Sequence, residues 1–140
     1  PKIGLINIGE EPEKGNELSK AAYQLMNNSA DFNFIGNIEG RDLFNEKADV
    51  MVCDGFTGNV VLKLAESFHS LFAKRGFSDP YLDRFNYENY GGTPVLGINS
   101  TVIVGHGISN APTIKNMITL AQEVVSAGLT DKIKAVLQHD

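Results

Sequence analysis

Residues 50–63, with the sequence VMVCDGFTGNVVLK, decide the fold that we predict for this chain. Residues 50–53 are apolar and rich in β-branched side chains, which predicts a short strand buried on both faces, as in a parallel sheet. A polar, glycine-rich loop follows at residues 54–59. From Val60 to Phe72 apolar residues recur at three- and four-residue spacing, which is typical of a helix with one apolar face.

A strand, a glycine-rich turn and a helix in this order indicate a site for an anion, phosphate above all. The turn places free backbone N–H groups and the positive end of a helix dipole at the carboxyl edge of a sheet. Thr57 is predicted to cap the helix, and Gly55 and Gly58 would let the backbone approach a ligand closely. No Gly-Lys-Ser/Thr follows the glycines, so the segment is not a Walker loop. An ordinary βα turn is the alternative that this segment leaves open.

Composition favours one globular domain over residues 1–140, with 42% hydrophobic and 21% charged residues. A net charge of −5 with scattered basic residues argues against a nucleic-acid partner. No apolar run approaches the roughly 20 residues that span a bilayer. The single cysteine, Cys53, fits a reducing, cytoplasmic location. Because the chain opens at Pro1 without an initiator methionine, we expect its natural start to be missing.

The rest of the chain predicts an α/β fold, layered, with a mostly parallel sheet flanked by helices. Further strands are expected at residues 3–8 and 32–35, with a helix at 17–26 between them. Residues 74–90 read as a surface excursion with at most a short helix. Residues 95–98 and 101–104 are expected to pair as an antiparallel hairpin around Asn99 and Ser100. Helices are predicted after Asn110, ending at Gly128, and over 129–137.

Strand–loop–helix passages occur three times, after Ile8, after Cys53 and after Val104. Ligands bind beyond the carboxyl ends of the strands in such sheets, so we expect these loops to meet in one cleft. The polar residues that they would contribute are Lys14, Asp54, Thr57, Asn59, His106, Ser109 and Asn110.

Each of these residues also has a purely structural interpretation. Lys14 lies among three glutamates and could be their ion-pair partner, and His106 could bond the backbone. For Asp54 we favour a role in holding the N–H groups of the glycine loop. Cys53 invites an acyl-carrying role, but at the end of a strand a small buried hydrophobe is the favoured interpretation. No metal-ligand spacing and no dinucleotide fingerprint are found, so no metal and no cofactor are expected.

Several long motifs resemble the bacterial phosphate acyltransferases of phospholipid synthesis. They lie at residues 7–11 with 14–17, and at residues 34–42, 54–63, 90–97 and 106–110. The resemblance runs nearly end to end and implies transfer of a fatty acyl group from acyl carrier protein to inorganic phosphate. It also implies a homodimer and a fold similar to the isocitrate and isopropylmalate dehydrogenases. Family chains are much longer, so this chain resembles their carboxy-terminal portion, which by itself is expected to show little activity.

The resemblance assigns catalysis to Lys14 and Asn59. Second-rank candidates for binding substrate or phosphate are Arg41, Asp54, Gly55, Thr57, Gly58, His106, Ser109 and Asn110. The segment at residues 72–90 is shorter than the corresponding hydrophobic helical segment of many relatives, which is thought to touch the membrane. Peripheral membrane contact of this chain is therefore an open question. Three alternatives also stay open: a phosphate acetyl- or butyryltransferase that uses coenzyme A, a non-catalytic phosphate-binding module, and a dimerisation half without a site.

Overall fold

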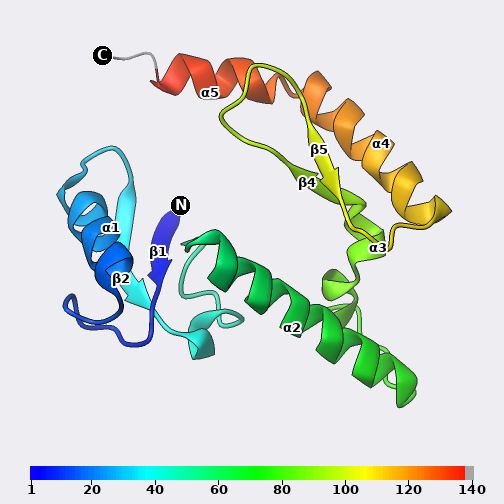
Figure 1. The fold of residues 1–140 in the computed structure, drawn as a ribbon, viewed down its shortest axis with the longest axis horizontal. Coiled ribbons are helices and arrows are strands. Elements are labelled where there is room, and N and C mark those ends of the chain that lie inside the picture. The colour runs from blue at the N-terminus through cyan, green and yellow to red at the C-terminus, as the bar shows by residue number, and fades with distance from the viewer. Residues whose placement is uncertain (138–140) are drawn as a thin grey trace. The chain divides into compact units, whose positions relative to one another are not determined.

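The structure, a computed structural model, describes residues 1–137. It divides into two compact units, Pro1–Val61 and Leu62–Asp140, which are described one at a time (Figure 1). His139, which looks unremarkable in the sequence, lies outside the described residues.

The first unit is built on a three-stranded parallel sheet with the order β2-β1-β3. Its strands are β1 (Lys2–Ile6), β2 (Asn33–Ile38) and β3 (Val50–Val52). Helix α1 (Glu17–Asn28) connects β1 to β2, and a 3₁₀ turn (Gly40–Asp42) lies between β2 and β3 (Figure 1). The α/β class and the parallel sheet predicted from the sequence are confirmed.

The core of this unit is small and centres on β1. Leu5, Ile38 and Ala48 are its buried hydrophobic residues. The prediction that residues 50–53 are buried on both faces is wrong for this chain, because β3 is an edge strand. It pairs only with β1 within the described residues, and Val50 and Val52 remain 44% and 38% exposed.

Helix α2 (Gly55–Lys74) begins three residues earlier than the predicted cap at Thr57 implies, and five residues before the apolar pattern that begins at Val60. The segment expected to be a glycine-rich loop is therefore the first turns of the helix. Asn59 lies in the second turn, where backbone N–H groups are already bonded within the helix.

The second unit joins short elements to two C-terminal helices. A 3₁₀ turn (Leu82–Phe85) and the single-turn helix α3 (Tyr87–Tyr90) occupy the predicted excursion. Strands β4 (Gly92–Pro94) and β5 (Ile103–Gly105) form a separate antiparallel pair. The helices are α4 (Ala111–Ser126) and α5 (Leu129–Leu137), with α4 packed along α3 and the β4–β5 pair (Figure 1).

The hairpin is confirmed but its predicted bounds are wrong. Pro94 pairs with Ile103, and residues between them form the connection, so Asn99 and Ser100 are not a two-residue turn between strands. The Met117 side chain packs against both glycines of this pairing. A Cβ on Gly105 would fall 2.7 Å from Met117 Sδ, and a Cβ on Gly92 would fall 3.1 Å from Met117 Cγ and 2.5 Å from the carbonyl oxygen of Val104 on the partner strand. Packing against α4 thus favours the register that pairs Gly92 with Gly105.

The apolar face of α4 differs in part from the prediction. Met117 and Val124 are half-buried, but Ile114, Ile118 and Val125 remain exposed. None of the helices described in residues 1–137 combines the length and the apolar character needed to cross a membrane.

Candidate functional site

Three loops meet at one edge of the parallel sheet, because parallel strands end at the same edge. They follow β1 (residues 7–16), β2 (residues 39–49) and β3 (Cys53 and Asp54). The first and the last belong to the predicted cleft. The loop after Val104 lies in the second unit, on a different sheet, so its place in that cleft stays a prediction.

The loop after β1 is held by two asparagines. Asn7 Nδ2 donates to the carbonyl of Lys14 over 3.1 Å, and Asn7 Oδ1 accepts from the N–H of Ile8. Buried Asn37 donates from Nδ2 to the carbonyl of Glu11 over 2.8 Å, and the N–H of Lys14 donates to the same oxygen. The backbone around Lys14 is thus fixed at both ends.

Glycine is required beside Lys14. Gly15 has φ +91°, and a Cβ there would fall 2.4 Å from Asn7 Oδ1 and 2.2 Å from Ser19 Oγ. The tight turn directs the chain into α1, where the side chain of Asn16 caps the helix by accepting from the N–H of Ser19.

Lys14 is exposed and joins none of the ion pairs formed within residues 1–137. Its glutamate neighbours therefore do not neutralise it by direct pairing. Glu10 instead pairs with Arg41 and Lys47. Lys14 remains available to an anionic ligand.

Asp54 caps α2, a role that the sequence assigned to Thr57. The N–H of Thr57 donates to Asp54 Oδ1 over 2.9 Å, and the Thr57 hydroxyl donates to Oδ2 over 2.6 Å. These bonds, that of the hydroxyl first, hold the pKa of Asp54 below its ordinary value. The prediction that Asp54 binds the N–H groups of this segment is confirmed, and the capping role of Thr57 is wrong.

The cap changes how an anion could bind here. A carboxylate already faces the positive end of the α2 dipole and accepts from its N–H groups. A phosphate placed beside it would be repelled unless a cation compensates. The charge match must therefore come from side chains, and Lys14 and Arg41 are the predicted site residues that carry positive charge in this unit.

The predicted site residues at the start of α2 differ in accessibility. Gly55 is exposed, and a Cβ there would meet no atom within 4 Å. Gly58 faces inward, since a Cβ there would lie 3.1 Å from Cys53 Sγ. Asn59 is exposed, so its amide is free to face solvent or a ligand.

A hollow of about 340 Å³ lies between the ends of β1 and β3 and the start of α1 and α2. Its wall is mainly apolar, with a few polar side chains. The polar residues are Asn7, Asn16, Ser19, Asp54 and Thr57, and Cys53 also contributes. The hollow thus joins two of the predicted loops, although Lys14, Arg41 and Asn59 are not part of its wall.

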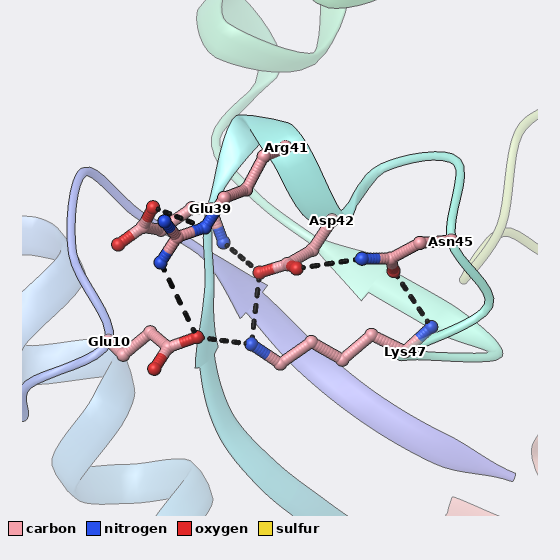
Figure 2. Close-up of polar contacts among 6 residues, drawn as sticks. All are labelled: Glu10, Glu39, Arg41, Asp42, Asn45 and Lys47. Atoms are coloured by element: carbon pink, nitrogen blue, oxygen red, sulfur yellow. Dashed lines mark hydrogen bonds and ion pairs between the residues drawn. The ribbon is translucent and has the colours of Figure 1, made fainter.

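A cluster of charged and polar side chains connects the loops after β1 and β2 (Figure 2). We call Glu10, Glu39, Arg41, Asp42, Asn45 and Lys47 the edge cluster. Lys47 Nζ binds Glu10 Oε1 and, over 3.0 Å, Asp42 Oδ2. Arg41 Nε lies 3.0 Å from Glu39 Oε2 and its Nη2 lies 3.9 Å from Glu10 Oε1.

Asp42 is the buried centre of the edge cluster. Hydrogen bonds from the Glu39 N–H, Asn45 and Lys47 lower its pKa from 3.8 to about 2. Bonds to Glu10 and Asp42 raise the pKa of Lys47, so both charges persist at neutral pH. The sequence predicts Arg41 as a site residue, but not Glu10, Asp42 or Lys47. Glu10 and Lys47 are 37 positions apart in the sequence, and they meet because β1 and β2 end at the same edge of the sheet.

The predicted residues of the second unit have structural roles of their own. Asn110 caps α4, since Oδ1 accepts from the Thr113 N–H and hydroxyl, and its Nδ2 donates to Glu88 over 2.6 Å. The Ser109 hydroxyl donates to the carbonyl of His106 over 2.6 Å. His106 stacks on Tyr87 with ring centroids 4.7 Å apart, and its Nε2 lies 3.5 Å from Glu66.

Within the part of the chain that the structure describes, no group of three or more His, Cys, Asp or Glu side chains could hold a metal ion. The polar groups that the first unit offers to a ligand are the Lys14 ammonium, the Asn59 amide, the capped carboxylate of Asp54 and the edge cluster.

Comparison with known proteins assigns the chain to a family. The family model described as "Fatty acid synthesis protein" matches residues 1–75 and 78–132. A phosphate acyltransferase of Desulforamulus reducens is 42% identical over 158 aligned positions, which cover all of this chain and 47% of that protein. Phosphate acyltransferases of Halothermothrix orenii and Pelotomaculum thermopropionicum are 42% and 44% identical.

These matches cover 100% and 99% of this chain, and 48% and 46% of the two relatives. The chain thus spans about half the length of the curated relatives that it matches. Because the family match extends over most of its residues, the chain belongs to the fatty acid synthesis protein family.

Proposed function

We propose that the protein containing this chain transfers a fatty acyl group from acyl carrier protein to inorganic phosphate. The observation that carries the proposal is that relatives more than 40% identical over the whole chain bear the name phosphate acyltransferase. The family description, a fatty acid synthesis protein, favours a carrier-protein thioester over coenzyme A as the acyl donor.

The reaction needs a nucleophile, a held carbonyl and a leaving thiol. A phosphate oxygen attacks the thioester carbonyl carbon, and the C–O bond forms as a tetrahedral oxyanion develops. When this intermediate collapses, the C–S bond breaks, the carrier leaves as a thiolate that takes up a proton, and acyl phosphate remains. No covalent acyl-enzyme is required, which leaves Cys53 without a chemical role.

Lys14 and Asn59 are assigned the central roles in this reaction. The exposed Lys14 ammonium would bind phosphate, and its charge would offset the repulsion from Asp54. The exposed Asn59 amide would donate to the oxyanion as charge develops. Arg41, Gly55, Thr57 and Gly58 would shape the site in this unit. In the second unit, His106, Ser109 and Asn110 are proposed to bind substrate or phosphate.

The assembly belongs to the same proposal. We infer a homodimer in the cytoplasm with a fold similar to the isocitrate and isopropylmalate dehydrogenases, and peripheral contact with the inner face of the membrane. Support comes from the parallel sheet of the first unit and from the many exposed apolar side chains, among them Phe56, Leu62 and Leu64 on α2.

The decisive experiment compares acyl donors with the full-length protein. Thiol release is followed with and without inorganic phosphate, and acyl phosphate is trapped with hydroxylamine. We expect phosphate-dependent release, one acyl phosphate per thiol, and a higher kcat/KM for the carrier thioester than for the coenzyme A thioester. Lys14→Ala should remove most of the activity, whereas Lys20→Ala, an ion-paired lysine on α1, should not.

Other outcomes identify the alternatives. Preference for a short coenzyme A thioester would indicate an acetyl- or butyryltransferase. Phosphate binding without thiol release would indicate a non-catalytic binding module. Absence of both would leave a dimerisation role.

A further inference from the structure

We propose that the edge cluster positions Lys14 through the loop after β1, with the Lys47–Glu10 ion pair as the device that holds the loop. Lys47 and Glu10 are then positioning residues, and Lys47 does not itself bind phosphate. The inference rests on the proposed function, because Lys14 is the residue to be positioned.

The fixed end of this device is Asp42. Its side chain is only 7% exposed, and it accepts from the Glu39 N–H over 3.0 Å and from Asn45 Nδ2 over 2.9 Å. These bonds lie within the loop after β2, whose strand pairs directly with β1. Asp42 is therefore a rigid anchor on the sheet edge.

Lys47 transfers this rigidity to the neighbouring loop. Its ammonium bonds to Asp42 on one side and to Glu10 on the other, 37 residues away in sequence (Figure 2). Arg41 adds a longer contact to the same Glu10 oxygen. Two carboxylates share the Lys47 charge, so little of that charge is left for an external anion.

Backbone hydrogen bonding connects the position of Glu10 to that of Lys14. The carbonyl of Glu11, the next residue, accepts from Asn37 and from the N–H of Lys14. The stem of Lys14 lies over Gly9, since a Cβ there would come within 2.8 Å of Lys14 Cγ. Moving Glu10 would therefore displace both the backbone of Lys14 and Gly9, against which the Lys14 side chain packs.

Two of the contacts that hold this loop to β2 and to the loop after β2 differ in chemistry. Asn37 supplies a neutral hydrogen bond from a buried position, and Lys47 supplies an ion pair at a half-exposed one. A charge-assisted bond is stronger and can be removed without emptying the core, so Glu10 is the better place to test the device.

The test uses the full-length protein with Glu10→Gln, which removes the charge from the loop end and leaves the Lys47–Asp42 pair. The matched control is Glu17→Gln, an exposed carboxylate that pairs with Lys20 on α1. We expect Glu10→Gln to lower kcat/KM for phosphate about 10-fold, within the range that a misplacement of about 1 Å produces. The melting temperature and the KM for the thioester should stay unchanged, and Glu17→Gln should resemble the parent protein.

A double-mutant cycle separates positioning from an independent contribution. If Glu10 acts through Lys14, the variant carrying Glu10→Gln and Lys14→Ala is no less active than Lys14→Ala alone. Additive losses would overturn the proposal. Lys47→Arg, which keeps the cation, should retain more activity than Lys47→Met; equal losses in the two variants would also count against it.

Hydrogen exchange provides a readout that does not depend on activity. Peptides covering residues 8–16 should exchange faster in Glu10→Gln than in Glu17→Gln, while peptides from β2 should be unchanged. If the parent protein forms no acyl phosphate, the proposed function fails, and exchange still decides whether the ion pair holds the loop. Unchanged exchange at residues 8–16 would overturn the positioning role.

Discussion

At the scale of single residues, Asn59 and Lys14 are predicted to fail in different ways when replaced. Asn59→Ala should lower kcat by about 10²–10³ with a smaller change in KM, because a neutral donor to an oxyanion acts mainly in the transition state. Lys14→Ala should also raise the KM for phosphate, since it removes a full charge. Steady-state kinetics of the full-length protein measure both effects.

The control for this pair is Asn27→Ala, which removes another exposed helical asparagine in the first unit. All three variants should stay folded, because none of the side chains is buried. Parent-level kcat in Asn59→Ala would show that the start of α2 only shapes the fold.

Cys53 is predicted to be structural. Burial, and then the charge of Asp54, raise the pKa of its thiol, so little thiolate forms at neutral pH. Its sulfur lies against the turn of α2 at Gly58. Cys53→Ala should keep near-parent kcat and lose about 1 kcal/mol of stability from packing. Mass spectrometry after incubation with the thioester provides the check, and an acylated Cys53 would contradict the prediction.

Asp42 gives the fold a pH dependence of known sign. Its pKa is about 2 in the folded chain against an ordinary value of 3.8, so the unfolded state binds more protons between these two values. The contribution of Asp42 to stability is therefore present above pH 4 and is lost as the pH falls towards 2. Urea unfolding of the full-length protein over this range measures it.

The matching variant is Asp42→Asn. Its deficit in the free energy of unfolding relative to the parent should be full at neutral pH and should shrink as the pH falls through this range. A deficit independent of pH between 2 and 5 would mean that the charge of Asp42 does not stabilise the fold.

At the scale of elements, variants of Asn110 can distinguish its role as the cap of α4 from its predicted role in binding phosphate. The structure uses its Oδ1 to cap α4, and a cap is typically worth about 1 kcal/mol. Asn110→Ala should lose that stability, while Asn110→Ser should retain most of it because serine also caps well. Thermal unfolding of the full-length protein measures the difference.

Kinetics of the same two variants test the phosphate-binding role predicted for Asn110. If both variants raise the KM for phosphate although only one is destabilised, Asn110 binds the ligand as well as capping α4. If KM follows stability, its role is limited to the cap.

The elements also show what the sequence could and could not predict. The parallel sheet, α1, α4 and α5 follow from local patterns of apolar residues and from the stop at Gly128. The predicted start of α2 is wrong because Gly55 and Gly58 suggested a loop. In the structure both glycines lie in the first turn of the helix, which the Asp54 side chain caps. Asp54 and Thr57 both have the chemistry of a cap, and the prediction chose Thr57 where the structure uses Asp54.

Long-range contacts account for the other differences. The hairpin register lies where Gly92 and Gly105 pack against Met117, and the edge cluster requires that β1 and β2 end at the same edge. Neither contact leaves a periodic signal in the sequence. Among the site residues predicted from the sequence, Lys14 and those at positions 54–59 lie in local motifs.

At the scale of the whole molecule, this chain buries little apolar surface. The hydrophobic residues buried among residues 1–137 are Leu5, Ile38 and Ala48, all in the first unit. Along α2, Phe56, Val60, Leu62 and Leu64 are each about half exposed or more. A helix that is apolar on most sides is typical of the interior of a larger protein or of an interface.

We therefore predict that the 140-residue chain by itself neither unfolds cooperatively nor turns over substrate. Its relatives are about twice as long, and a protein that leaves such side chains exposed gains too little from burial to offset the entropy of folding. The isolated chain should bind a hydrophobic dye and show a broad thermal transition, whereas the full-length protein should unfold sharply. Acyl phosphate formation, measured on both under the same conditions, should be found only with the full-length protein. A sharp transition and full turnover in the isolated chain would show instead that these 140 residues contain a complete core and a complete site.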